Sequence, residues 1–303
     1  MKKNKGFVTI ATGGDNYYKM AADLLNSYRV RGKGKYPFAI ICDHENEYTA
    51  LFDDVVLVNE FHRSTVDKLL IRYSPYQETL FMDADILILD NIDDLWDVFQ
   101  DADDVSAFGC VLPLDSQAGW FTYEGSGKYR NQIKFLLSMN GGIYFFRKNA
   151  RSEKVFADAI SVMADYATID FKYFDAPQDE PLMAMSMVIN GCKPCEKSYP
   201  MIILPACDKK ITVDVSGDIY EDNSCSNAKF IHFSSPRTKG FLYNYLNEIN
   251  YQQEEWRTRT NYLRIKSRHA MADTKFTLYH NAGDILRRCG FASVVEWLKK
   301  HLH

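Results

Sequence analysis

Short apolar runs alternate with longer amphipathic segments over the first two hundred residues of this chain, and this alternation limits its possible folds most. Apolar, β-branched runs predict buried strands, and apolar residues at every third or fourth position predict helices. The predicted strands are 6–11, 37–42, 54–58, 79–89, 106–112, 142–147 and 230–233, and the predicted helices are 15–29, 64–73, 152–167 and 179–189. Strands and helices in alternation predict an α/β fold with a largely parallel sheet.

Two carboxylates interrupt the predicted strand 79–89. Asp83 and Asp85 stand one residue apart between two apolar runs. Unpaired carboxylates at a strand end would repel each other and lose hydration, and a divalent cation removes both problems. Mg²⁺ and Mn²⁺ prefer such oxygen ligands. A calcium-binding EF-hand loop also begins Asp-x-Asp, but Ile88 stands where that loop needs glycine. The motif therefore predicts a metal site with open positions suited to nucleotide phosphates.

The composition is that of an ordinary globular protein. The chain has 303 residues, 46% of them hydrophobic, and a net charge of −4, which argues against binding to a polyanion. We find neither a signal-peptide pattern nor an apolar run of membrane-spanning length, and therefore expect a cytoplasmic protein. The seven scattered cysteines suit reduced thiols. A zinc site is the alternative, although its four members lack a second close pair: Cys192, Cys195, Cys207 and Cys225.

The end of the chain differs in charge from the rest. From residue 256 onward there are ten Lys or Arg against three Asp or Glu, with aromatic residues interspersed. Helical spacing of apolar residues begins at Phe241 and returns at 285–298, so we predict a helical C-terminal region, 241–303, after a domain formed by 1–240. Basic charge with aromatics indicates peripheral contact with an anionic membrane or an acidic partner. The alternative is a packed helical appendage with solvated charges. No nucleic-acid-binding module is indicated.

Five segments occur in an order that resembles a known family. They are Val-Thr-Ile-Ala-Thr at 8–12, the aspartate block at 81–96, Asn-Gly-Gly-Ile-Tyr at 140–144, Asp-Glu at 179–180 and Ile-His-Phe at 231–233. The chain is similar in these to the family 8 glycosyltransferases of the GT-A fold, which include glycogenin and bacterial lipopolysaccharide galactosyl- and glucosyltransferases. The resemblance covers residues 6–240. It implies a Rossmann-type mixed sheet flanked by helices.

The resemblance also implies an activity. Members of the family transfer a hexose from a nucleotide sugar, here most simply a UDP-hexose, to a saccharide or glycolipid acceptor in polysaccharide or lipopolysaccharide synthesis. The sugar keeps its anomeric configuration, and Mn²⁺ or Mg²⁺ is required. By this resemblance the metal ligands are Asp83, Asp85 and His232, although a histidine on a strand can equally be a core residue bonded to backbone.

The residues implied in donor binding lie in five places along the chain. Tyr17 would stack on the base, unless it is a core aromatic of its helix, and a basic side chain suits the diphosphate. Glycines would allow the donor sugar to approach the backbone. The full set is Ala11, Thr12, Asn16, Tyr17, Lys68, Asp83, Ala84, Asn140, Gly141, Gly142 and Lys239.

The chain departs from the family pattern at two places. Glu180, which with Asp179 is the predicted catalytic pair, stands where the family often has glutamine. Its carboxylate would stabilise or attack an oxocarbenium-like transition state, or it merely favours the first turn of a helix. After His232 the family's Lys-Pro-Trp is missing, and Arg237 and Lys239 stand one position out of register.

Two other functions share this sheet and metal motif. A sugar-phosphate nucleotidyltransferase would carry a basic residue in the turn 12–15, which lacks one. A non-catalytic sugar-nucleotide-binding relative is disfavoured by the intact metal-ligand set. The donor hexose, the acceptor and the linkage are not determined by the sequence.

Overall fold

A computed structural model describes residues 4–214, 217–234, 240–252, 263–268 and 271. The chain forms two compact units, Met1–Ile203 with Asn227–Ser234, and Leu204–Ser226 with Ser235–His303. The first unit holds every predicted site residue except Lys239. Lys239, Arg237 and the predicted helical segment 285–298 lie outside the described residues, and the domain boundary after residue 240 stays a prediction.

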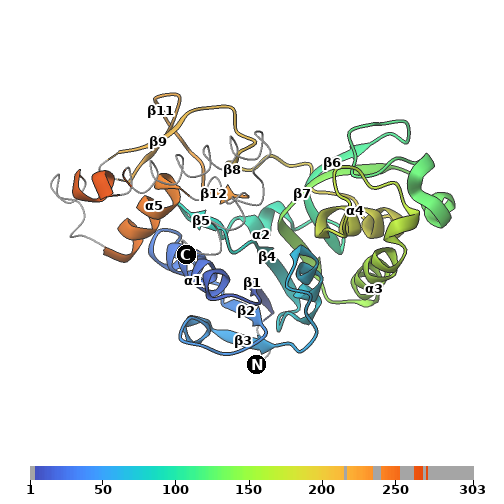
Figure 1. Ribbon diagram of the computed structural model, residues 1–303, viewed down its shortest axis with the longest axis horizontal. Coiled ribbons are helices and arrows are strands. Elements are labelled where there is room, and N and C mark those ends of the chain that lie inside the picture. Colours follow the sequence, from blue (N-terminus) through green and yellow to red (C-terminus); the bar gives the residue numbers. More distant parts are fainter. Residues whose placement is uncertain (1–3, 215–216, 235–239, 253–262, 269–270, 272–303) are drawn as a thin grey trace, which may run out of the picture. The chain divides into compact units, whose positions relative to one another are not determined.

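A six-stranded mixed sheet forms the centre of the first unit (Figure 1). Its order is β3-β2-β1-β4-β7-β6. The first four of these strands are parallel, and β7 runs antiparallel to both β4 and β6. The α/β prediction is therefore confirmed, and the sheet is mixed. The strands are β1 (Lys5–Ala11), β2 (Phe38–Cys42), β3 (Asp54–Leu57), β4 (Glu78–Met82), β6 (Val105–Leu112) and β7 (Leu136–Arg147).

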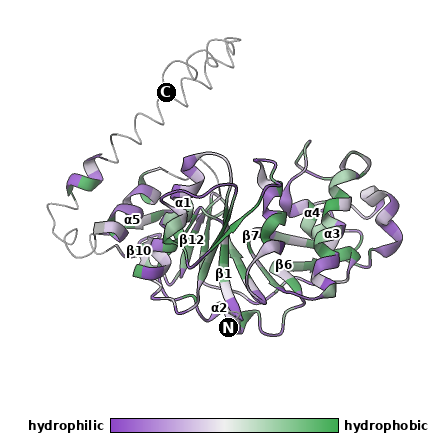
Figure 2. Ribbon diagram, turned by 90° about the horizontal axis from the view of Figure 1, so that it is seen from below, coloured by the Kyte–Doolittle hydropathy of each residue, from purple (hydrophilic) through white to green (hydrophobic). Residues whose placement is uncertain are grey.

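Helices cover both faces of this sheet because its strands are apolar on both sides. Leu80 of β4 packs in the core beneath α1 (Asp15–Val30), whereas Phe81 packs with α3 (Ala150–Ala164) and α4 (Asp179–Ile189) on the opposite face. The strands of this sheet are coloured mostly as hydrophobic in Figure 2. The remaining short helices of the unit are η1 (Thr49–Leu51), η2 (Thr65–Tyr73), α2 (Leu95–Val98), η3 (Glu124–Gln132) and η4 (Tyr166–Thr168).

The predicted strand 79–89 is wrong as one element, because the chain changes sheets at the aspartates. β4 ends at Met82, and β5 (Ile86–Ile88) begins after Asp85. β5 pairs antiparallel with β12 (Phe230–Phe233) in a separate sheet of order β5-β12-β8, where β8 is Met201–Leu204. A strand cannot continue straight into a second sheet, so residues 83–85 form a turn in which the Ile86 amide donates to the Asp83 carbonyl at 3.1 Å.

Smaller differences concern helix ends and type. The predicted helix 64–73 is a 3₁₀-helix over Thr65–Tyr73, and Ser64, which precedes it, makes no side-chain capping bond. The helices predicted at 15–29 and 179–189 begin at Asp15 and Asp179, and the capping positions before them are Gly14 and Gln178. An acidic residue in the first turn still suits the positive end of the helix dipole, which explains the sequence signal.

The second unit contains a small antiparallel sheet and a helix. The sheet has the order β11-β10-β9, formed by β9 (Ile211–Val213), β10 (Ile219–Glu221) and β11 (Ser224–Cys225). The helix predicted from Phe241 is confirmed as α5 (Phe241–Gln252). Among the described residues, we find no helix with the length and hydropathy that crossing a membrane requires.

Candidate functional site

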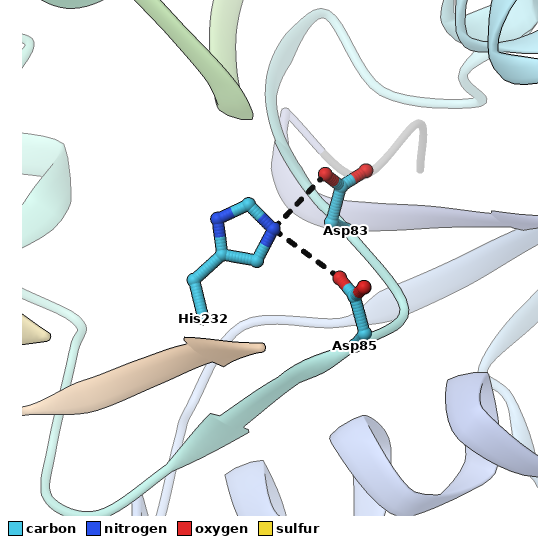
Figure 3. A group of neighbouring side chains, drawn as sticks. All are labelled: Asp83, Asp85 and His232. Carbon is cyan, nitrogen blue, oxygen red and sulfur yellow. Dashed lines mark ion pairs between the residues drawn. The ribbon is translucent and has the colours of Figure 1, made fainter. Parts of the chain in front are cut away.

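The change of sheets brings Asp83, Asp85 and His232 together. Asp83 follows β4, Asp85 precedes β5, and His232 lies on β12 directly opposite Ile86 of β5. Its ring nitrogen Nε2 lies 3.3 Å from Asp83 Oδ2 and 3.3 Å from Asp85 Oδ1 (Figure 3). One ligand atom from each residue lies within 4.8 Å of the others. Within the described part of the chain, this is the one such group of three His, Cys, Asp or Glu side chains.

This donor set fits a divalent cation. Ligand atoms placed at right angles about 2.1 Å from one small ion lie ~3 Å apart, close to the two nitrogen–oxygen distances. Two carboxylates and one imidazole suit Mn²⁺, and three protein ligands leave positions for other oxygens. The residues present therefore match the sequence prediction of a metal site.

His232 is held in a nearly dry position. Its side chain is buried against Gly142, where an added Cβ would lie 2.5 Å from the imidazole ring. Burial disfavours the imidazolium, but the hydrogen bonds and charges of Asp83 and Asp85 outweigh it and raise the pKa of His232 to about 9. A metal bound here would replace that proton, since a histidine ligand must be neutral.

A salt bridge and a backbone bond fix the strand that carries His232. The ammonium of Lys229, just before β12, donates to Asp94 Oδ2 at 2.7 Å and to the Asn91 carbonyl at 2.9 Å. The Tyr199 hydroxyl donates to the other oxygen of Asp94 at 2.7 Å. At the far end of the strand, the Phe233 amide donates to the Asp85 carbonyl at 3.0 Å. Asp94 was noticed only as part of the aspartate block 81–96, and Lys229 and Tyr199 were missed, because only the tertiary fold brings the three together.

Lys68 connects the metal-ligand group to the start of α4. Its ammonium lies 2.9 Å from Asp83 Oδ2, 3.1 Å from Asp179 Oδ2 and 3.3 Å from the Gly141 carbonyl. Burial opposes the charge of Lys68, but Asp179 and Asp83 together raise its pKa. Burial also disfavours the charged form of Asp179 and so raises its pKa, and Lys68 opposes that shift. One cation thus compensates carboxylates from two elements.

Glu180 contacts the glycine pair of β7. Its Oε1 accepts the Gly141 amide at 2.6 Å, and a Cβ at Gly141 would lie 2.6 Å from the Glu180 Cγ. Only glycine admits this approach without displacement. Burial and then the charge of Asp179 raise the pKa of Glu180. The neighbouring Asn140 accepts the Gly142 amide at 3.0 Å through its Oδ1. The structure therefore brings together the predicted Asn140, Gly141, Asp179 and Glu180.

The end of β1 lies at the same edge of the sheet as Asp83, since β1 pairs in parallel with β4. Thr12 donates through its hydroxyl to Asp67 Oδ2 at 2.8 Å, a partner that sequence reasoning missed. Tyr17 is 55% exposed, so it is no core aromatic; the next residue, Tyr18, is the buried one. Asn16 is exposed too. Ala11 lies in the core beneath α1, and Ala84 packs against that core.

The cysteines of the alternative zinc site are spread over both units. All six cysteines in the described part of the chain are free thiols, and Cys289 lies outside it. Burial raises the pKa of Cys192 to about 11, so this thiol is a poor nucleophile at neutral pH.

Comparison with known proteins places the fold. No protein-family model matches the chain, and no curated protein does. Among solved structures it is similar to the galactosyltransferase LgtC in complex with donor and acceptor sugar analogues, with 16% identity and a TM-score of 0.51 over 83% of this chain and 99% of that one. An active-site mutant of LgtC gives a TM-score of 0.50 at the same identity and coverage.

A third solved structure, the apo form of the bifunctional glycosyltransferase WbbM, covers 89% of this chain and 52% of that one, at 14% identity and a TM-score of 0.48. At the identities of the two LgtC structures, the likeness establishes the fold. The predicted GT-A-like arrangement of a mixed sheet flanked by helices is thereby confirmed.

Proposed function

We propose that this protein is a metal-dependent, retaining glycosyltransferase that moves a hexose from UDP-hexose to a saccharide or glycolipid acceptor. The observation that carries the proposal is the convergence of Asp83, Asp85 and His232, with 3.3 Å between the imidazole and each carboxylate, at the carboxyl end of β4. In open α/β sheets, ligands bind beyond the carboxyl ends of the strands. The shared fold with a galactosyltransferase supports the same assignment.

The three ligands would hold Mn²⁺ or Mg²⁺. When bound, the ion supplies Lewis-acid stabilisation of the negative charge that develops on the leaving diphosphate. Lys68, fixed between Asp83 and Asp179, adds a second positive charge on the same side of the sheet. We assign Lys239 to the diphosphate on the sequence alone.

The nucleoside belongs at the end of β1. Tyr17 exposes its ring, which can stack on a base, and Thr12 and Asn16 supply polar groups beside it. We assign Ala11 and Ala84 to the donor site on the sequence pattern, although Ala11 itself lies in the core beneath α1. The donor sugar then lies along Asn140, Gly141 and Gly142, because β7 is the other neighbour of β4 in the sheet.

The acidic pair at the start of α4 supplies the charge opposite the leaving group. Asp179 is neutralised by Lys68 at 3.1 Å, whereas the carboxylate of Glu180 accepts the uncharged amide of Gly141. We therefore assign Glu180 as the carboxylate that stabilises or attacks the anomeric carbon, and Asp179 as the residue that positions Lys68. A half-buried carboxylate is effective here because water screens it less than at the surface.

The nature of the acceptor suggests where in the cell the enzyme acts. A growing polysaccharide or glycolipid presents its end at a membrane, so we propose a cytoplasmic enzyme that contacts the membrane peripherally through its basic region 241–303.

Calorimetry with UDP, GDP and ADP tests the donor assignment. In the presence of Mn²⁺, UDP should bind more tightly than the other two, and Asp85→Ala should abolish Mn²⁺-dependent binding. The variant should stay folded, because removing one carboxylate relieves repulsion between Asp83 and Asp85. Asp101→Ala, at an 85% exposed side chain, is the matched control. Equal binding of the three nucleotides, or UDP binding that ignores Mn²⁺, contradicts the proposal.

Donor turnover tests the reaction itself. With Mn²⁺, the protein should hydrolyse a UDP-hexose slowly in the absence of acceptor, and proton NMR of the first sugar released or transferred should show a retained anomeric configuration. An inverted centre contradicts the retaining assignment while leaving sugar transfer intact.

A further inference from the structure

Three aromatic side chains from two distant segments of the first unit lie together. Trp120 comes from the chain between β6 and β7, and Tyr173 and Phe174 come from the chain before α4. The Trp120 and Phe174 rings stack with centroids 5.8 Å apart, and Tyr173 meets Trp120 edge-on at 6.1 Å. We call these three residues the aromatic platform. Tyr173 is 74% exposed, so one ring of the platform faces solvent.

The platform is a built feature of the fold. The two segments are joined by a β-bridge between Phe121 and Phe171 and by a bond from the Lys172 amide to the Trp120 carbonyl at 2.8 Å. Tyr173 has a φ of +73°, a left-handed value that a bulky residue rarely adopts. Residues kept in such conformations cluster at ligand-binding sites, because the surrounding structure must compensate for their cost.

The platform is attached at two points to the proposed donor site. The Trp120 indole donates to the Met139 carbonyl at 3.3 Å, and Met139 directly precedes Asn140. The other segment continues from Phe174 through Gln178, which accepts the Thr65 hydroxyl at 2.6 Å, into Asp179. The aromatic rings are therefore connected to β7 and to the start of α4, the two elements assigned to the donor sugar.

The sheet order separates this platform from the nucleoside. β4, which ends just before Asp83, lies between β1 and β7. The base and ribose are assigned to the β1 side, whereas the platform is tied to the β7 side. A group bound at the platform thus approaches the transferred sugar from the side away from the nucleoside, which is where an acceptor must enter.

We propose that the aromatic platform binds a pyranose ring of the saccharide acceptor, with Tyr173 as the residue that contacts it. A pyranose has an apolar face of C–H groups that packs on an aromatic ring, and hydroxyls at its edge that need polar partners. Tyrosine offers an apolar ring with a polar tip, which suits both. This inference rests on the proposed function, because the acceptor is defined by that reaction.

Saturation-transfer NMR tests the platform without any transfer reaction. The probes are lactose, maltose and the methyl glycosides of glucose, galactose, mannose and N-acetylglucosamine. We expect the wild-type protein to transfer saturation to ring protons of at least one probe. Tyr173→Ala should raise the Kd of that saccharide about threefold to tenfold, the effect of losing one aromatic contact. Tyr173→Phe should retain binding, and Tyr73→Ala, at another exposed tyrosine, should behave as wild type.

Parallel measurements separate the possible failures. Calorimetry with UDP and Mn²⁺ should give the same Kd for all these variants. The platform assignment alone is overturned if Tyr173→Ala leaves saccharide binding unchanged. It is also overturned if the protein binds UDP but none of the saccharide probes. If the wild-type protein does not bind UDP, while its saccharide affinity still depends on Tyr173, the proposed function is overturned instead. Binding to anionic phospholipid vesicles that requires Tyr173, without saccharide binding, would assign the platform to a membrane and overturn the acceptor proposal.

Discussion

Replacing Lys68 by methionine removes the only positive charge that the structure places between Asp83 and Asp179 among the described residues. The ammonium lies 2.9 Å and 3.1 Å from their nearest oxygens, and the side chain is 19% exposed. Methionine keeps most of the volume and the unbranched shape, so the change tests the charge more than the packing. It leaves Asp83, Asp179 and Glu180 without their shared cation.

Two limits set the free energy of unfolding that Lys68→Met should lose. Removing one partner of a buried ion pair costs about 3–5 kcal/mol of the free energy of unfolding. A carboxylate left without its partner can instead take up a proton, which at pH 7 costs at most about 4 kcal/mol from an unperturbed pKa of about 3.9. We therefore expect Lys68→Met to lose about 3–4 kcal/mol at pH 7 in metal-free buffer.

The stability lost in Lys68→Met should depend on pH. Without Lys68 the pKa of Asp179, already raised by burial, moves further above its unfolded value. The folded protein then binds more protons than the unfolded chain, so its stability rises as the pH falls. The deficit should shrink by about 1.4 kcal/mol for each pH unit between about 7 and 5.

Urea unfolding followed by circular dichroism measures these changes. Measurements in EDTA at pH 7, 6 and 5 give the deficit, and Mn²⁺ at about 100 times its Kd should restore about 2.7 kcal/mol by binding the folded state. Lys154→Met is the matched control, because the exposed pair of Lys154 with Asp158 contributes only about 0.3–0.5 kcal/mol. Adding Asp179→Asn to Lys68→Met should recover stability, since it removes one of the unpaired charges.

A loss below about 1 kcal/mol in EDTA would refute this reasoning. It would mean that water reaches the carboxylates and screens them as at the surface. A deficit that does not change between pH 7 and pH 5 would place the effect in packing instead of charge.

Three further predictions concern the metal-ligand group and its neighbours. Hydrogen bonds with two carboxylates raise the pKa of His232 to about 9, so its proton must leave when a metal binds. The Mn²⁺ affinity measured by calorimetry should therefore rise about tenfold per pH unit between about 6.5 and 8.5. His232→Gln should flatten that dependence. Gly142→Ala places a Cβ 2.5 Å from the imidazole. It should lower the Mn²⁺ affinity and lower the stability by about 1–3 kcal/mol, seen as a lower Tm. Gly14→Ala meets nothing within 4 Å and changes only the N-cap of α1, so it should lower the Tm less and leave the Mn²⁺ affinity unchanged; equal effects of the two variants contradict the close contact between glycine and imidazole. Glu180→Gln should slow donor turnover by orders of magnitude if the carboxylate acts on the anomeric carbon, and a rate within about tenfold, ~1.4 kcal/mol, would show that Glu180 only positions groups by hydrogen bonding.

Local chemistry in the sequence was enough to find most elements of the sheet. Apolar runs located β1, β2, β3, β6 and β12 to within a residue or two at each end. Strands such as β2 and β12, which are buried on both faces, need apolar side chains at every position. The length of β7 was underestimated, since its first half, 136–141, includes Ser138, Asn140 and Gly141, which lack the apolar pattern. The pairing partner β6, distant in sequence but adjacent in space, makes it a strand.

The motif Asp83–Asp85 was readable from sequence, but its geometry was not. A continuous apolar pattern cannot reveal that the chain leaves one sheet and enters another, because residues on both sides of the turn are equally buried. The hydrogen-bonding partners decide this, β1 and β7 for one strand and β12 for the other.

The sequence alone identified the chemical groups: two carboxylates, an imidazole and an acidic pair on or beside predicted strand and helix ends, and an ammonium inside the predicted helix 64–73. Only the folded chain determines which of these groups meet. Lys68 pairs with both Asp83 and Asp179, Glu180 contacts Gly141, and Trp120 lies with Tyr173, although these partners are separated by many residues along the chain. Such contacts depend on strand order and helix placement, which result from burying the whole core, and no local pattern specifies them.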